Sequence, residues 1–196
     1  MHHIHTTDGF IVGSKPYGEA HKLIYVYTRD LGFLTAIAQG IRLEKSKLRY
    51  SIRDYSFASF SLVHGKEFWR IVGASEILNK YSKEKEKQRL AIFGPVALIL
   101  RRLLHGQESC VEIFDCLINC ADFIESQSVL ENEILKTLES LTIARILYRL
   151  GYVGVNDSKE FELDSIEYSD RLVSVLVLKR TMINQKINLA LRESHL

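Results

Sequence analysis

The chain has 196 residues, 46% of them hydrophobic and 26% charged, and its formal net charge is +2. This length permits one large domain or two small ones, and the composition is that of an ordinary soluble globular protein. No stretch reaches the roughly 18 apolar residues of a membrane span, and no signal peptide opens the chain. We therefore expect a cytoplasmic protein without membrane contact.

The first part of the chain reads as short strands separated by turns. His21–Thr28 is rich in β-branched and aromatic residues, and a tight turn leads from it into the next run, which predicts a hairpin. The predicted strands are Phe10–Val12, His21–Thr28, Phe33–Ala38, Tyr55–Val63 and Phe68–Val72. Five short strands with no long helix among them predict a small closed or nearly closed barrel.

The residue pattern changes from strand-like to helix-like near residues 78–84. We place a domain boundary there, between residues 1–80 and 81–196. Apolar residues then recur at helical spacing. Gly94 and Pro95 should kink or split the first helix, and residues 152–167 read as a loop. The predicted helices are Leu90–Leu104, preceded by the charged turns Lys83–Arg89, then Ser109–Gln127, Leu130–Leu150, and one from Ser169 and Asp170 to about Arg192. The predicted fold is an α+β chain in which a β-barrel is followed by an all-α domain.

Positive charge is concentrated in the predicted barrel. Residues 1–82 carry a net charge of +4, and residues 83–196 carry −2. A cluster of five cations lies against one acid, Glu44, and comprises Arg42, Lys45, Lys47, Arg49 and Arg53. Such a segment either binds along a phosphate backbone or is a solvated loop without a ligand, and the charge pattern is compatible with both interpretations. Further cations that can extend it are Lys15, Lys22, Arg29, Lys66 and Arg70.

Phe68 and Trp69 occupy adjacent positions of a strand, so one side chain faces inward and the other outward. An exposed aromatic ring on a barrel can stack on a base. Packing in the core or between domains is the alternative for Trp69.

Catalytic and metal-binding patterns are missing from the sequence. There is no P-loop, no convergent set of carboxylates and no supported nucleophile arrangement, so we predict that the protein is not an enzyme and needs no cofactor. Cys110, Cys116 and Cys120 form no CxxC pair and are expected to be small buried side chains in a reducing compartment. His2, His3 and His5 lack a fourth ligand at suitable spacing, so no metal site is expected.

The strand-rich part resembles the RecO family of recombination mediators. The matching positions are Gly18, Glu19, Lys22, Thr28, Gly32, Ala38, Gly40, Arg42, Ser46, Arg49, Gly65 and Trp69. His21 stands where the family often has Asp, and Tyr148–Tyr152 resembles a helix-ending motif of the family. The resemblance implies an OB-fold barrel followed by a helical domain, and a cytoplasmic, nucleoid-associated protein. It also implies binding of single- and double-stranded DNA, strand annealing and help in loading the RecA recombinase.

The family's partners are RecR and the acidic C-terminal tail of single-strand-binding protein. By analogy, a cationic rim for that tail is expected from Arg101, Arg102, Arg145 and Arg149. Many relatives carry a four-cysteine zinc module after the helix-ending motif, whereas no cysteine follows Cys120 here. We therefore expect no zinc and a shortened C-terminal domain. Two alternatives remain: a protein-interaction scaffold of the same fold with little DNA affinity, and an RNA-binding barrel.

Overall fold

The computed structural model describes the whole chain except residues 1–2, 79–82, 105, 107, 129 and 194–196. The chain divides into two compact units. The barrel unit comprises Met1–Lys80 together with Leu104–Phe114, and the helical unit comprises Tyr81–Leu103 together with Asp115–Leu196. Residues 104–114 therefore belong with the barrel, although they follow a long helix in sequence.

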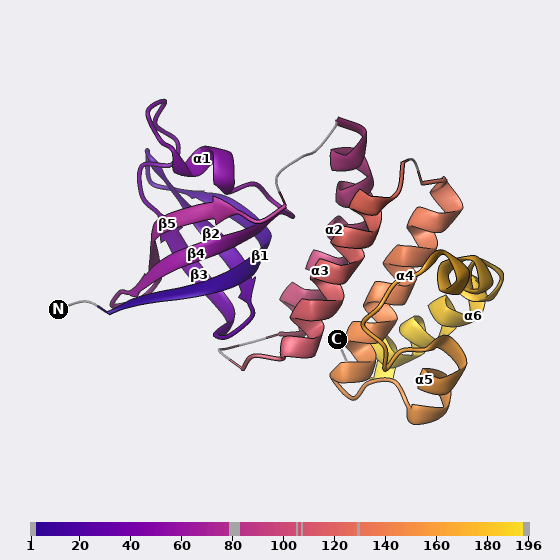
Figure 1. The fold of residues 1–196 in the computed structure, drawn as a ribbon. Coiled ribbons are helices and arrows are strands. Elements are labelled where there is room, and N and C mark those ends of the chain that lie inside the picture. Colours follow the sequence, from indigo (N-terminus) through magenta and orange to yellow (C-terminus); the bar gives the residue numbers. More distant parts are fainter. Residues whose placement is uncertain (1–2, 79–82, 105, 107, 129, 194–196) are drawn as a thin grey trace. The chain divides into compact units, whose positions relative to one another are not determined.

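The barrel unit is a closed barrel of five strands in the order β1-β2-β3-β5-β4 (Figure 1). Its elements are β1 (Ile4–Tyr17), β2 (His21–Thr28), β3 (Gly32–Ala38), the short α1 (Leu48–Ser51), β4 (Phe57–His64) and β5 (Trp69–Glu76). Neighbouring strands are antiparallel except for β3 and β5, which pair in parallel. The predicted barrel is confirmed, and its topology is that of the OB-fold.

Strand β1 is much longer than the predicted Phe10–Val12. Its first half pairs with β4 and its second half with β2, with an irregularity in the register between Ile11 and Gly13. Such a bulge bends a strand, and here it allows one strand to join two edges and close the barrel. The sequence does not predict the full length of β1, because the polar residues at both of its ends lack the apolar alternation of a half-buried strand.

The interior of the barrel is filled from alternate strand positions. Ala58, Phe60 and Leu62 of β4 face inward, as do Trp69 and Ile71 of β5. Side chains on the intervening positions point to the outer side of the barrel, where some of them, such as Phe57 and Val63, are covered by other residues. This alternation fixes which residues of β3 and β5 are available to a ligand.

The helical unit is built from α2 (Lys83–Leu103), most of α3 (Val111–Ser126), α4 (Asn132–Arg149), α5 (Val155–Phe161) and α6 (Asp170–Glu193). Gly94 and Pro95 were expected to kink or split the first helix; they do not split it, because α2 continues through Pro95. Ala91, whose carbonyl Pro95 leaves without its helical partner, is exposed and can bind water instead. Helix α5 also lies in a segment predicted to be a loop. No helix among the described residues is long and apolar enough to cross a membrane.

Candidate functional site

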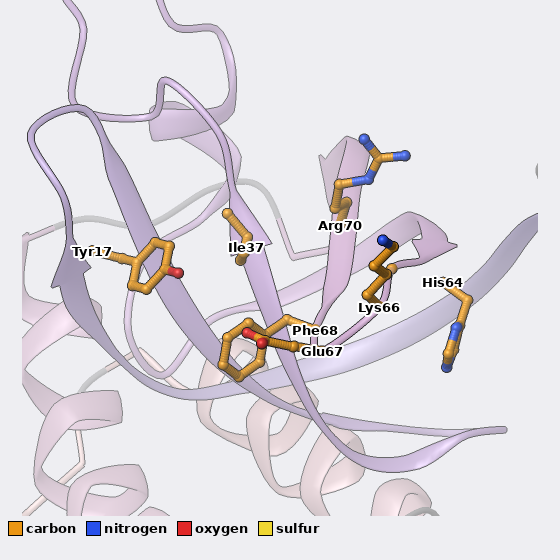
Figure 2. Close-up of a pocket in the computed structure, with 8 residues that line it drawn as sticks. Tyr17, Ile37, His64, Lys66, Glu67, Phe68 and Arg70 are labelled. Carbon is orange, nitrogen blue, oxygen red and sulfur yellow. The ribbon is translucent and has the colours of Figure 1, made fainter.

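A hollow of about 580 Å³ lies on the outer surface of the barrel (Figure 2). It forms where the turn between β4 and β5 lies beside the end of β1. The lining residues are Tyr17, Ile37, His64, Gly65, Lys66, Glu67, Phe68 and Arg70. All of them belong to the barrel unit.

Gly65 shapes the turn between β4 and β5. Its amide donates a hydrogen bond to the Phe68 carbonyl at 3.1 Å. A Cβ atom at this position would lie 2.3 Å from the same carbonyl oxygen, a distance that real Cβ contacts do not reach. Glycine is therefore required for the backbone to double back so tightly, and the turn delivers Lys66 and Phe68 to the hollow.

The pairing of β3 with β5 determines which side chains form the floor of the hollow. Ile37 pairs with Arg70, and the adjacent pair of Ala36 with Trp69 faces the interior. Ile37 and Arg70 therefore share the outer face. Ile37 also pairs with Leu23, and Leu23 pairs with Lys15, so that Lys15 belongs to the same row across the sheet.

Two aromatic rings meet at the hollow. The Tyr17 and Phe68 rings are arranged edge to face, with centroids 6.2 Å apart and an interplanar angle of 74°. Tyr17 is 41% exposed. Sequence reasoning did not select Tyr17, because it follows Lys15 and Pro16 in what reads as a break between strands.

Cations flank these rings. Lys66 is exposed, and Arg70 is half-buried. The Nε atom of Arg70 is buried and has no hydrogen-bond partner within the described part of the chain. Figure 2 shows the Lys66 and Arg70 side chains extending away from Phe68. Glu67 contributes the one acidic side chain of the lining, so the charge balance of the lining is positive.

Trp69 is placed in the barrel interior rather than on a binding surface. It is 7% exposed and belongs to the core cluster. The rings of His5 and His64 meet it edge to face at centroid distances of 5.3 and 5.0 Å. Its indole nitrogen is buried without a hydrogen-bond partner among the described residues. The stacking role considered for Trp69 is therefore excluded by burial, and Phe68 is the ring that reaches the hollow.

The basic segment is exposed at every one of its five cations, Arg42, Lys45, Lys47, Arg49 and Arg53. Its beginning is fixed to the turn between β1 and β2. The Arg42 amide donates to the Ala20 carbonyl at 3.1 Å, and its guanidinium donates to the Gly18 carbonyl at 3.2 Å. The Gly40 amide donates to Nδ1 of His21 at 2.9 Å. These contacts hold the start of the segment against the β1–β2 turn, which directly follows Tyr17.

The remaining candidate cations of the barrel do not gather in one place. Lys22 lies near one end of β2, and Arg29 follows the other end of that strand. Eight strand residues span about 25 Å, so the two cannot contact the same short stretch of ligand. The Arg29 guanidinium lies over the Phe114 ring at 6.0 Å. Arg53 forms an ion pair with Glu76 at 2.5 Å.

Arg145, expected in a cationic rim on the helical unit, is not available for one. Arg145 is completely buried. Its guanidinium donates to the carbonyls of Glu167 and Glu162 at 2.9 and 3.2 Å and lies over the Tyr168 ring. Arg149 donates to the carbonyls of Leu163, Asp164 and Ser165. Both arginines hold the segment between α5 and α6, because its backbone carbonyls need donors.

Arg101 and Arg102 remain at the surface, near the end of α2. Leu98 precedes them by one turn and is 66% exposed. These three residues share a helix face.

Two of the three cysteines are buried packing residues, as predicted, whereas Cys110 is only half-buried and its Sγ lies 3.3 Å from the Glu112 carboxylate. Cys116 and Cys120 are fully buried, and desolvation raises the pKa of both thiols, that of Cys120 to about 12. The described residues contain no group of three or more His, Cys, Asp and Glu side chains that can hold a metal ion. His2 lies outside the described residues, and His5 contacts Trp69.

Comparison with known proteins finds a family model that matches the strand-rich part of the chain. Residues 1–81 match the family model described as "Recombination protein O N terminal". The DNA repair protein RecO of Caldanaerobacter subterraneus is 26% identical over 152 residues, which cover 78% of this chain and 60% of the relative. DNA repair protein RecO of Heliobacterium modesticaldum is 26% identical over 149 residues, covering 76% and 52%. The RecO of Alkaliphilus metalliredigens is 21% identical over 133 residues, covering 68% and 54%.

The chain thus spans little more than half the length of these curated relatives. The match begins at residue 1 and includes the whole barrel, with both turns that form the hollow. Residues 1–81 are thus similar to the N-terminal part of recombination protein O, and the chain resembles curated DNA repair proteins RecO over two thirds or more of its length.

Proposed function

We propose that the barrel unit binds DNA, with a single strand lying across the hollow between Tyr17 and Arg70. The observation that carries this proposal is the combination of two partly exposed rings with two cations on the outer face of an OB-type barrel. The OB-fold binds oligonucleotides on this face, between the β1–β2 and β4–β5 loops. Aromatic rings stack on unpaired bases, and Lys and Arg neutralise phosphates with little sequence preference.

The basic segment extends this footprint. Because Arg42 is held to the β1–β2 turn, the exposed cations that follow it begin beside the Tyr17 end of the hollow. A strand that leaves the hollow there meets Lys45 and Lys47 next. Contacts of this kind are made to the backbone, which single and double strands share, so the segment supports binding to both.

In this proposal the protein acts in recombinational repair by binding rather than by catalysis. Neutralising two strands lowers their repulsion and promotes annealing, and a protein held on a gap can help to load RecA. RecR and the acidic tail of single-strand-binding protein are the proposed partners. For the tail, the exposed Leu98 beside Arg101 and Arg102 offers an apolar contact next to positive charge.

The test is the affinity for a fluorescent single-stranded oligonucleotide, measured across a salt series. The variants are Lys66→Glu and a triple reversal of Arg42, Lys45 and Lys47 to Glu. The control is Lys159→Glu, which reverses an exposed cation of the helical unit. Each lost phosphate contact should reduce the slope of log affinity against log salt by about 0.7 for a single strand.

We expect micromolar or tighter binding at low salt, weakened by both barrel variants and not by the control. Absence of binding at low salt would favour the protein-interaction scaffold. Equal effects of Lys66→Glu and Lys159→Glu would show that only net charge matters and would reject the hollow as the site.

A further inference from the structure

Helix α6 carries a buried apolar stripe and a second, exposed one about a third of the way round the helix from it. Val173, Leu176, Ile183, Ile187 and Ala190 are buried within the helical unit. The second stripe is exposed and consists of Val175 (51% exposed), Leu178 (89%), Met182 (45%) and Leu189 (50%). Its members are separated by intervals of three, four and seven residues, which place them on one face. We call this set the outer stripe.

A helix on the surface of a globular protein normally shows one apolar stripe toward the core and polar residues opposite. The outer stripe breaks that pattern with four large side chains, and Leu178 is almost fully in water. Contiguous exposed apolar surface of this kind marks an interaction site. Alternating intervals of three and four residues are those of a seam between two packed helices.

Two residues of opposite charge flank the two ends of the outer stripe. Arg171 lies one turn before Val175, and Glu193 lies one turn after Leu189; both are exposed. Met182 is the midpoint, because each of these charged residues is eleven positions away from it. Eleven residues make about three turns, so Arg171, Met182 and Glu193 lie on the same face.

We propose that the outer stripe binds a second copy of this chain, with the two α6 helices antiparallel and Met182 on the two-fold axis. Reversal about Met182 brings Val175 opposite the partner's Leu189 and Arg171 opposite the partner's Glu193. A two-fold interface must be self-complementary in this way, since the same surface faces itself. Met182, the pair of Val175 with Leu189 and the pair of Arg171 with Glu193 satisfy that condition. Leu178 lies opposite the partner's Lys186, whose aliphatic stem can cover it.

The lysines beside the outer stripe also favour a second copy over an acidic partner. Lys186 pairs with Asp157 at 2.9 Å, and Lys179 pairs with Glu160 at 3.5 Å, both within the helical unit. Their charges are thus partly neutralised before any partner arrives. This reduces repulsion between two copies, and it also reduces attraction for an acidic peptide.

The interface is small. One helix seam buries less than the about 1,600 Å² of a standard stable interface, so we expect a reversible dimer with a dissociation constant in the micromolar range. This inference concerns the helical unit and does not depend on DNA binding by the barrel.

Sedimentation velocity on the full chain across a concentration series tests the proposal. The wild-type protein should shift from monomer to dimer, and Leu178→Glu should remain monomeric. Asn188→Glu is the matched control, because it adds the same charge to an exposed position of α6 away from the outer stripe; it should dimerise as the wild type does. A monomer at every concentration, or a dimer that Leu178→Glu leaves intact, would overturn the proposal.

Two further variants test the antiparallel register. Arg171→Glu and Glu193→Arg should each weaken the dimer, and the double variant should restore it. Met182→Cys, made in a Cys110→Ser background, should form an intermolecular disulfide on oxidation because the two sulfurs meet at the axis. Leu178→Cys should cross-link far less, since its counterpart lies elsewhere on the partner. Equal cross-linking of both would reject the register.

Discussion

Phe68 and Tyr17 form an aromatic pair with ring centroids 6.2 Å apart, although one follows the β4–β5 turn and the other ends β1. The residues next to each ring in the sequence do not determine that the two rings are close together. Closure of the barrel brings them together, and the tight turn at Gly65 holds Phe68 in position. The pair presents apolar ring surface between cations, which is the feature that distinguishes a surface for unpaired bases from a surface for phosphates alone.

Removing either ring should therefore weaken binding of a single strand without changing its salt dependence. Stacking is worth about 1–3 kcal/mol per base, so Phe68→Ala and Tyr17→Ala should each lower affinity by about 5- to 150-fold. Fluorescence anisotropy with a labelled oligonucleotide measures this. Tyr152→Ala, which removes an exposed ring from the helical unit, should have no effect. Unchanged affinity in both barrel variants would place the bases elsewhere.

Glu76 should restrain DNA binding, because it neutralises a cation of the basic segment. Its carboxylate, 8% exposed, pairs with the Arg53 guanidinium at 2.5 Å. Glu76→Gln releases that charge, so we expect higher affinity at low salt and a slope steeper by about 0.7 for one additional phosphate contact. Glu160→Gln changes the net charge equally but lies on the helical unit. If it raises affinity as much, Arg53 has no specific role.

Arg145 should be required for the stability of the helical unit. Arg145→Met leaves the carbonyls of Glu162 and Glu167 without their donor. Each buried acceptor left unpaired costs about 1–3 kcal/mol, so the free energy of unfolding should fall by about 2–6 kcal/mol. Urea denaturation followed by circular dichroism measures the loss. Arg102→Met, at an exposed position, should stay within about 0.5 kcal/mol of the wild type. Similar losses in both variants would contradict the role assigned to Arg145.

Alkaline pH should destabilise the helical unit through its buried thiols. Burial raises the pKa of Cys120 from 9.0 to about 12, and the pKa of Cys116 moves in the same direction. The native state therefore keeps neutral thiols while the unfolded state ionises. The resulting stabilisation is complete below pH 9 and is lost as the pH rises toward 12, by up to about 1.4 kcal/mol per pH unit for each thiol.

Comparison of the wild type with Cys120→Ala isolates this effect, because alanine does not titrate. The difference in unfolding free energy between the two proteins should shrink between pH 9 and pH 11. A difference that stays constant over this range would show that Cys120 does not titrate on unfolding.

Local patterns in the sequence predict most of the barrel but not how it closes. The alternation of Tyr55–Val63 and the turn after Thr28 predict strands and a hairpin that the structure contains. The parallel pairing of β3 with β5 and the full length of β1 depend on partners distant in sequence, and no local pattern encodes them. Helix α5 is not predicted for a different reason: its seven residues contain only Ser158 and Phe161 as buried positions, too few to show helical spacing.

The candidate site was predicted in part. Charge alone selected Lys66, Arg70 and the basic segment, whereas Tyr17 required knowledge of which loops meet. Arg145 was misassigned because its spacing from Arg149 suggested an exposed face. A signal was nevertheless present: Ile143, Ala144, Ile146 and Leu147 surround it, and a helix that is apolar on all sides is buried. A single arginine in such a run indicates an internal hydrogen-bond donor rather than a surface charge.

The position of Trp69 has a practical consequence. It is the one tryptophan of the chain, and it lies inside the barrel unit. Its intrinsic emission therefore follows the barrel alone, whereas the far-ultraviolet dichroic signal is dominated by the helical unit. Recording both signals in one denaturation experiment gives two separate melting curves from an unlabelled protein. Coincident curves would identify one cooperative system, and separated curves would give each unit its own stability.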